Sequence, residues 1–122
     1  MTVLLLALAG GLGAVARFVL DGFLTAGRAR SYPVGTTLIN LSGSFLLGLL
    51  AGLAAGALLP GSAYLVLGTG FLGGYTTFST AAYETVRLVE QRRWGAALLH
   101  GLGQVVVATA LAALGYLVGS AG

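Results

Sequence analysis

The middle of one long apolar segment of this 122-residue chain contains residues that are unusual for a segment of that kind. Residues 70–80 read Gly-Phe-Leu-Gly-Gly-Tyr-Thr-Thr-Phe-Ser-Thr, with three glycines and four Ser or Thr side chains. In hydrocarbon every backbone N–H and C=O must be satisfied within the protein. A polar stretch that weakens a helix is therefore tolerated only where it packs against protein or lines a polar path. This stretch is therefore the first place where we expect a functional site.

Four further polar side chains are expected within or beside apolar segments. Asn40 either ties two helices together or lines a polar path, because an amide in lipid needs hydrogen-bond partners. His100 and Gln104 share one helix face, where they either line the same path or cross-link helices. Arg17 either anchors a span end, with Asp21 as a partner, or forms an anion-attracting vestibule.

The same inventory argues against catalysis and against a transition-metal site. A serine nucleophile needs a base within hydrogen-bond reach, but His100 is the only histidine and no Gly-x-Ser-x-Gly elbow is present. One histidine with no cysteine or carboxylate at ligand spacing provides too few metal ligands. We predict that the chain is not an enzyme. The usual carboxylate of a proton-coupled transporter is also missing, because all three carboxylates fall near span ends: Asp21, Glu84 and Glu90.

Composition places these residues in a membrane protein. The chain is 57% hydrophobic and 7% charged, with a mean hydropathy of +0.98, so it has too few charges to solvate the surface of a soluble domain. Its length allows a single transmembrane domain, residues 1–122. The net charge of +3 comes from arginines beside the spans rather than from a basic tail, so no nucleic-acid partner is expected.

Four segments are long enough to cross a bilayer as helices, since a crossing needs roughly 20 residues. They cover approximately residues 3–24, 34–59, 63–88 and 94–118. The short connections make each helix antiparallel to its neighbour, which predicts an all-α, up-down bundle. Small residues recur at every fourth position of the second span and predict a ridge for close helix association: Ser44, Gly48, Gly52 and Gly56.

Positive charge is predicted to lie on one side of this bundle. The second connection and both tails contain no Lys or Arg. Five arginines lie in or beside the first and third connections: Arg28, Arg30, Arg87, Arg92 and Arg93. The positive-inside rule then places both termini outside, in the inner (plasma) membrane of the cell, with a single orientation.

Three motifs resemble those of the CrcB/Fluc family of fluoride channels, in order and along essentially the whole chain. The first is Gly-Gly-Leu-Gly-Ala-Val-Ala-Arg at residues 10–17, and the second opens the second span at residues 33–45. The third is the stretch at residues 70–80, followed by Tyr83 and Glu84. One glycine-rich motif alone would be weak support, whereas three at matching depth are specific.

The resemblance implies an antiparallel dimer of four-helix subunits, with a broken third helix and two narrow fluoride pores at the subunit interface. It also implies a structural sodium ion (Na+) at the dimer centre, held by backbone carbonyls that here belong to Gly73 and Thr76. Hard cations prefer oxygen ligands, and broken helices free carbonyls for this use at the midplane. An ion bound by both subunits would favour assembly.

The resemblance also implies a pathway for fluoride. A small, strongly hydrated anion leaves water only if donors replace its shell, and amides and hydroxyls can do so without burying a full charge. Phe78 matches the first pore phenylalanine of the family, whose positive ring edge can face an anion, with core packing as the alternative. Passive export of fluoride is the expected function. The other pathway residues are Asn40, Thr77, Ser79, Thr80 and Gln104.

Two positions depart from the family pattern. A second pore phenylalanine is expected three residues after Phe78, but Ala81 stands there. On the fourth span Gln104 replaces an expected serine, and either donates in its place or blocks the path. The loss of the phenylalanine and the one-sided charge, which opposes insertion in both orientations, together predict half of a heterodimer. The partner would be a second, antiparallel CrcB-like subunit.

Two other functions remain open for a small four-span protein. A small multidrug-type transporter also dimerises antiparallel, but it depends on a membrane-embedded glutamate in the first span, and none is present here. A non-transporting membrane assembly subunit would use the small-residue ridge of the second span.

Overall fold

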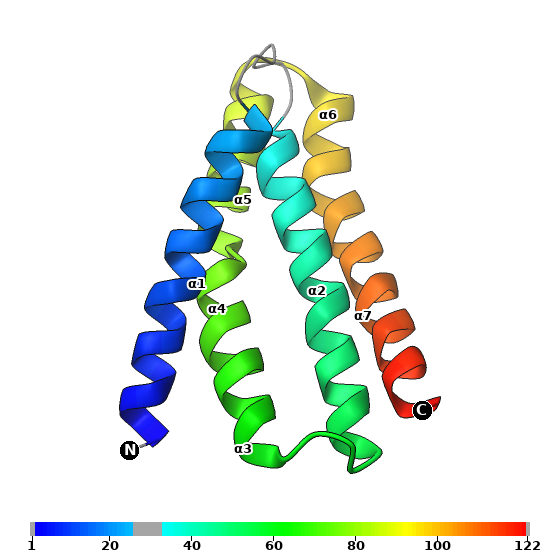
Figure 1. Cartoon of the computed structure of the whole chain (residues 1–122). Coiled ribbons are helices and arrows are strands. Elements are labelled where there is room, and N and C mark those ends of the chain that lie inside the picture. The colour runs from blue at the N-terminus through cyan, green and yellow to red at the C-terminus, as the bar shows by residue number, and fades with distance from the viewer. Residues whose placement is uncertain (1, 26–32, 122) are drawn as a thin grey trace.

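Helices account for every regular element in the residues that the computed structural model describes, 2–25 and 33–121 (Figure 1). This confirms the predicted all-α class. Two helices are long and uninterrupted: α1, Thr2–Thr25, and α2, Val34–Ala55. The rest of the described chain forms shorter pieces, where η denotes π-helical turns: α3 Gly61–Tyr64, η1 Leu65–Leu72, α4 Gly73–Tyr75, α5 Phe78–Glu90, α6 Trp94–Leu98, η2 Leu99–Gly103 and α7 Gln104–Ala121.

The pieces align into four rods that run side by side, with both chain ends at the same end of the bundle (Figure 1). α1 and α2 are the first two rods. The third comprises α3, η1, α4 and α5, and the fourth comprises α6, η2 and α7. Within the described residues three helical stretches are long and apolar enough to cross a membrane: Thr2–Leu24, Val34–Ala55 and Trp94–Ala121.

These three stretches correspond to the first, second and fourth predicted spans. The predicted third span, residues 63–88, lies within the third rod, which is helical for most of its length. It is not one continuous helix, because Thr76 and Thr77 separate α4 from α5.

The second span ends earlier as a helix than its apolar composition predicts. The expected end was residue 59, whereas α2 ends at Ala55. Ala57 has a left-handed backbone with φ of 61°, and the Leu58 N–H donates to the Leu53 carbonyl at 2.9 Å, a pattern that stops helices. Hydropathy alone does not indicate that the helix ends at Ala55, although the nearby Pro60 is a sequence signal for a helix end.

Backbone contact without intervening side chains holds α2 against α7. A Cβ added to Gly48 would meet the Ala112 carbonyl, and one added to Gly115 would meet the Phe45 carbonyl. Gly52 and the backbone of Tyr116 form a third contact of the same kind. The predicted small-residue ridge is therefore used within the chain, where it brings the second and fourth rods together.

A second close contact joins α1 to the third rod. A Cβ on Gly13 would meet the Phe71 carbonyl, and one on Gly74 would meet the backbone of Gly10. The π-helical turns of η1 lie beside this contact. α1 thus packs against the third rod just before the point where the helix of that rod is interrupted.

Few side chains are buried in the described residues. The main buried apolar cluster is Ile39, Leu72 and Tyr75, at the centre of the bundle near the interruption. Large apolar side chains on the outer faces are exposed, as Phe18 and Phe23 illustrate. Such outer faces suit hydrocarbon rather than water.

The structure describes only some of the arginines on which the predicted charge asymmetry depends. Arg28 and Arg30 lie outside the described residues. Arg92 and Arg93 belong to the turn between α5 and α6, which lies at the end of the bundle opposite both termini (Figure 1). Arg92 has a left-handed backbone with φ of 59°, and the Arg93 N–H donates to the Leu88 carbonyl at 2.9 Å, which closes α5.

The glycine contacts predict a difference between two otherwise similar substitutions. Gly48→Ala should lower the free energy of unfolding by ~1–3 kcal/mol, because the added methyl group meets the Ala112 backbone, which cannot rotate away. Gly11→Ala is the matched control, since nothing lies within 4 Å of its Cβ position. It should leave the stability unchanged or raise it by up to ~1 kcal/mol. Thermal unfolding in detergent, followed by circular dichroism, measures both. Equal effects would contradict the described α2–α7 contact.

Candidate functional site

The third rod is interrupted where the sequence places its threonines. Thr76 has φ and ψ of −83° and 159°, and Thr77 has −146° and 122°, so both are extended. Glycine and β-branched residues favour helix weakly, which makes this the point where the helix is easiest to interrupt. Thr77 also begins α5, because its hydroxyl accepts a hydrogen bond from the Thr80 N–H at 3.2 Å, as an N-cap does.

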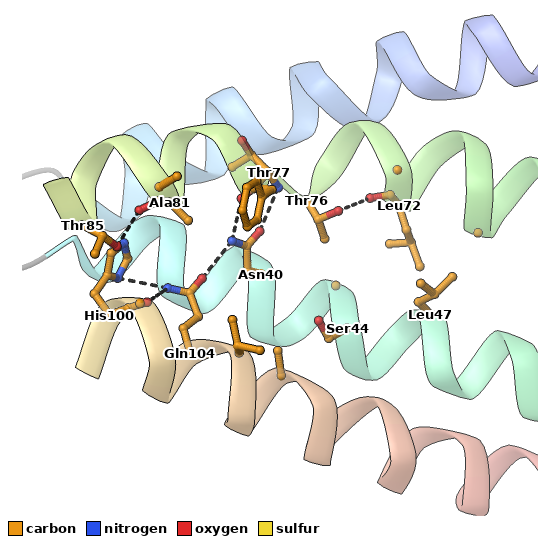
Figure 2. A pocket seen from close by; sticks show the side chains of 18 of the residues that line it. Asn40, Ser44, Leu47, Leu72, Thr76, Thr77, Ala81, Thr85, His100 and Gln104 are labelled. Atoms are coloured by element: carbon orange, nitrogen blue, oxygen red, sulfur yellow. Dashed lines mark hydrogen bonds between the residues drawn. The ribbon is translucent and has the colours of Figure 1, made fainter. Parts of the chain in front are cut away.

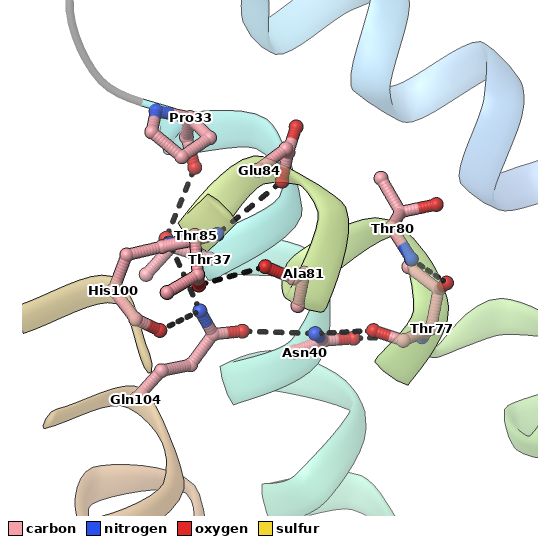
Figure 3. Close-up of polar contacts among 10 residues, drawn as sticks. All are labelled: Pro33, Thr37, Asn40, Thr77, Thr80, Ala81, Glu84, Thr85, His100 and Gln104. Carbon is pink, nitrogen blue, oxygen red and sulfur yellow. Dashed lines mark hydrogen bonds and ion pairs between the residues drawn. The ribbon is translucent and has the colours of Figure 1, made fainter. Parts of the chain in front are cut away.

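The Asn40 side chain pairs with the backbone of Thr77 at the interruption. Its Oδ1 accepts from the Thr77 N–H, and its Nδ2 donates to the Thr77 carbonyl, both at 2.8 Å (Figure 3). The side-chain amide thus pairs with the Thr77 backbone as a second peptide group would. A buried backbone group without a partner is costly in lipid, so this pairing allows the extended residues to lie inside the bundle.

Close approach of α2 to the interruption makes the pairing possible. A Cβ added to Gly43, on α2, would meet the Thr76 side chain and would lie 3.3 Å from the Tyr75 ring. Tyr75 is buried, and its hydroxyl lies 3.1 Å from the Ser42 hydroxyl, which itself donates to the Ile39 carbonyl. α2 therefore packs against the end of α4, next to the residues that Asn40 pairs with.

A chain of polar side chains leads from Asn40 into the fourth rod (Figure 3). Asn40 Nδ2 donates to Gln104 Oε1 at 2.8 Å, and Gln104 Nε2 donates to the His100 carbonyl at 2.8 Å. Gln104 Nε2 also lies 3.0 Å from His100 Nδ1. The other ring nitrogen, Nε2, lies 3.3 Å from Glu84 Oε1 on α5. Polar contacts therefore link α2, α7 and α5 around the interruption.

The partners fix the direction of each bond. The Thr77 N–H needs an oxygen and the Thr77 carbonyl needs an N–H, so the Asn40 amide has one possible orientation. Gln104 must then present Oε1 to Asn40 and Nε2 to His100.

The interruption also redirects backbone N–H groups away from two particular carbonyls. In a continuous helix the Thr77 N–H would bond to the Gly73 carbonyl and the Thr80 N–H to the Thr76 carbonyl. Here they bond to the Asn40 and Thr77 side chains instead. The Gly73 and Thr76 carbonyls are thus released from their helical partners, and neutral carbonyl oxygens of this kind suit a hard cation.

Arg17 acts at the same place from α1. Its Nε donates to the Gly74 carbonyl at 3.3 Å, a carbonyl that would accept from the Phe78 N–H in a continuous helix. A guanidinium at the C-terminal end of a helical segment satisfies a carbonyl and complements its partial negative charge. The structure therefore places Arg17 against the interruption, and the sequence alternatives of an anchor or a vestibule did not include this contact.

A groove of about 910 Å³ lies alongside these residues and is bordered by α2, both halves of the third rod and the fourth rod (Figure 2). Its lining is mainly apolar. The predicted pathway and cation residues that line it are Asn40, Gly73, Thr76, Thr77, Phe78 and Gln104. Ala81, which stands where the second phenylalanine was expected, also lines the groove.

Some predicted residues lie elsewhere, and some residues of the site were not predicted. Ser79, Thr80 and Arg17 do not line the groove. Phe78 lines it with a ring that is 83% exposed in the single chain. The roles of Ser42, Tyr75 and Glu84 were missed, because each contacts a residue on another helix and sequence spacing carries no signal for such pairs.

Comparison with known proteins finds the same family that the three sequence motifs resemble. A family model described as "CrcB-like protein, Camphor Resistance (CrcB)" matches residues 4–116. The chain is 56% identical over 119 residues to fluoride-specific ion channel FluC 1 of Leifsonia xyli subsp. xyli, covering 98% of this chain and 87% of the relative. It is 49% identical over 109 residues to FluC 2 of Mycolicibacterium paratuberculosis, covering 89% and 86%. It is 46% identical over 123 residues to FluC 2 of Cutibacterium acnes, covering 98% of each.

The pairing of Asn40 with Thr77 predicts a large effect of one substitution. Asn40→Leu keeps the volume but leaves the Thr77 N–H and carbonyl without these partners, at ~1–3 kcal/mol for each group. We expect the free energy of unfolding to fall by ~2–5 kcal/mol and the Thr77 amide to exchange its hydrogen faster. Hydrogen exchange followed by mass spectrometry and thermal unfolding measure the two effects.

Thr109→Val is the control for this substitution. The Thr109 hydroxyl donates only within its own helix, to the Val105 carbonyl at 2.8 Å, on an exposed face. Its loss should change stability by less than ~0.5 kcal/mol. A Thr77 amide that stays equally protected in Asn40→Leu would show that the pairing does not hold the interruption.

Proposed function

This chain belongs to the CrcB-like family, and we propose that it is a subunit of a fluoride-specific ion channel through which fluoride leaves the cytoplasm passively. The observation that carries the proposal is the 56% identity, over nearly the whole chain, to a protein named as such a channel. The relatives are named as channels, in agreement with the expectation that the chain is not an enzyme. The apolar helices and the family together make it a multi-pass membrane protein.

We place the fluoride pathway along the groove. Amides and hydroxyls can replace the hydration shell of a small anion, and three residues with such side chains line the groove beside the interruption: Asn40, Thr77 and Gln104. Phe78 presents an exposed ring there, whose positive edge can face an anion. Ser79 and Thr80 follow directly in the chain and would extend the path beyond the groove, where a second subunit covers them.

We further propose that the carbonyls of Gly73 and Thr76 hold a structural sodium ion at the centre of a dimer. Support comes from the redirection of the Thr77 and Thr80 N–H groups, which releases these two carbonyls. One chain offers two such oxygens, so an antiparallel partner would complete the ligand set. Bound there, the ion supplies positive charge that holds the two interrupted helices together.

The partner is proposed to be a second CrcB-like subunit rather than a copy of this chain. Ala81 leaves the groove without the second phenylalanine that the family pattern places there. The one-sided arginines favour a single orientation in the inner (plasma) membrane, with both termini outside, and an antiparallel homodimer needs two orientations.

No observation in the described residues specifically favours either alternative function. The small multidrug-type transporter lacks its membrane-embedded glutamate in the first span. The assembly subunit was expected to use the ridge of α2, but Gly48 and Gly52 pack against α7 of the same chain. The central part of that ridge is therefore already covered within the chain.

Fluoride efflux from liposomes tests the channel and its composition together. The chain purified from its own host, with the subunit that accompanies it, should release fluoride but not chloride, as measured with ion-selective electrodes. The chain expressed alone should release fluoride much more slowly, because its groove lacks a phenylalanine. No fluoride release from either sample would contradict the channel. Full release by the chain alone, inserted in both orientations, would contradict only the heterodimer.

Removal of sodium tests the proposed cation. Replacing Na+ by N-methylglucamine should shift the purified assembly towards monomers, because an ion that binds only the dimer stabilises it by mass action. Analytical ultracentrifugation in detergent measures the shift, and restored NaCl should reverse it. Potassium of the same ionic strength is the control for general salt effects. An unchanged monomer–dimer equilibrium would exclude a sodium ion that links the subunits.

A further inference from the structure

The two amides beside the interruption have their hydrogens committed within the chain. Asn40 Nδ2 donates one hydrogen to the Thr77 carbonyl and the other to Gln104 Oε1, both at 2.8 Å. Gln104 Nε2 faces the carbonyl and Nδ1 of His100, at 2.8 and 3.0 Å. An anion in the groove needs N–H or O–H donors, and in this arrangement the Asn40 amide offers none.

The two bonds of Asn40 Nδ2 are not equivalent. The bond to Thr77 satisfies a backbone carbonyl at the interruption, and its loss would leave that carbonyl without this partner inside the membrane. The bond to Gln104 satisfies only a side chain. The hydrogen held by Gln104 is therefore the one that can be redirected towards a ligand in the groove.

We propose that Gln104, positioned by His100, withholds this hydrogen of Asn40 from an anion in the groove. The proposal rests on the proposed fluoride pathway, and it decides between the two roles that Gln104 could have there. Gln104 is a positioning residue that keeps the pathway around this chain's Asn40 closed, and it does not act as a donor in place of serine. A shorter side chain at position 104 would end well short of Asn40 Nδ2 and leave its hydrogen available.

His100 keeps Gln104 in this orientation. Its side chain is buried, with Nε2 at 3.3 Å from Glu84 Oε1 and Nδ1 at 3.2 Å from the Thr37 hydroxyl. If the Gln104 amide turned over, its NH₂ group would face the Asn40 NH₂ group, and its oxygen would face the His100 carbonyl. Like groups then oppose each other on both sides, so Gln104 has one stable orientation.

The sequence allows this to be measured at a single site. Asn40 is the only asparagine of the chain, so labelling this chain alone with ¹⁵N-asparagine, with any partner subunit left unlabelled, gives one side-chain NH₂ pair in an NMR spectrum. The purified protein in lipid nanodiscs is titrated with sodium fluoride, and sodium chloride at the same concentrations serves as the ion control. Gln104→Met keeps most of the volume and removes the acceptor, whereas Gln104→Ser also opens space. Gln91→Met, in the exposed turn after α5, is the matched control.

We expect fluoride to shift the Asn40 NH₂ signals in Gln104→Met and Gln104→Ser, but not in the wild type or in Gln91→Met at the same concentrations. One released hydrogen bond corresponds to a gain of about tenfold in fluoride affinity, or ~1.4 kcal/mol. Signals of the wild type that move with fluoride as readily as those of the variants would overturn the proposal. Variants whose Asn40 NH₂ signals do not shift with fluoride would also overturn the proposal.

Fluoride efflux from liposomes, measured on the same samples, separates this proposal from the proposed function. Gln104→Ser should release fluoride, but not chloride, faster than the wild type, and a leaky misfolded variant would release both ions. If the wild type conducts fluoride while the Asn40 signals move in no variant, the channel stands and the role of Gln104 is wrong. If the variant signals move but no sample conducts, the role of Gln104 in anion access stands and the channel is wrong.

Discussion

Lipid offers the protein backbone no hydrogen-bond partners, and the centre of this molecule is arranged around that constraint. Thr76 and Thr77 leave the helical conformation at the centre of the bundle, so the groups they release must find partners in the chain. Asn40 pairs with both polar groups of the Thr77 backbone, and Arg17 takes the Gly74 carbonyl. An extended segment inside the membrane is thereby made stable without a second strand.

These contacts require close helix packing, since the Asn40 and Arg17 side chains reach their partners only where the helix backbones lie close together. Gly43 lets α2 lie against Thr76 and Tyr75, and Gly13 lets α1 lie against the Phe71 backbone. The contact of α2 with α7 through Gly48 then brings Gln104 to Asn40. Glycine, which weakens a helix as an isolated element, here permits the contacts that hold the bundle together.

The sequence predicted the helical class, three of the spans as helices and the stretch in which the third rod is interrupted, because hydropathy and glycine content are local properties. It missed the end of α2 at Ala55, where backbone conformation rather than hydropathy decides. For Asn40 it left open whether the amide ties helices or lines a path, and the structure shows that it ties them and also borders the groove. The pairing of His100 with Glu84 could not be predicted, because it depends on how two rods face each other.

The order of residues in the chain gives the Asn40 contact a consequence for biogenesis. Synthesis proceeds from the N-terminus, so the amide that caps the interruption enters the membrane before the threonine that needs it. Gln104 and His100 follow only with the last helix. A nascent chain halted after α5 already holds both members of the Asn40–Thr77 pair, whereas the contacts that orient the amide from its other side must wait for the fourth rod.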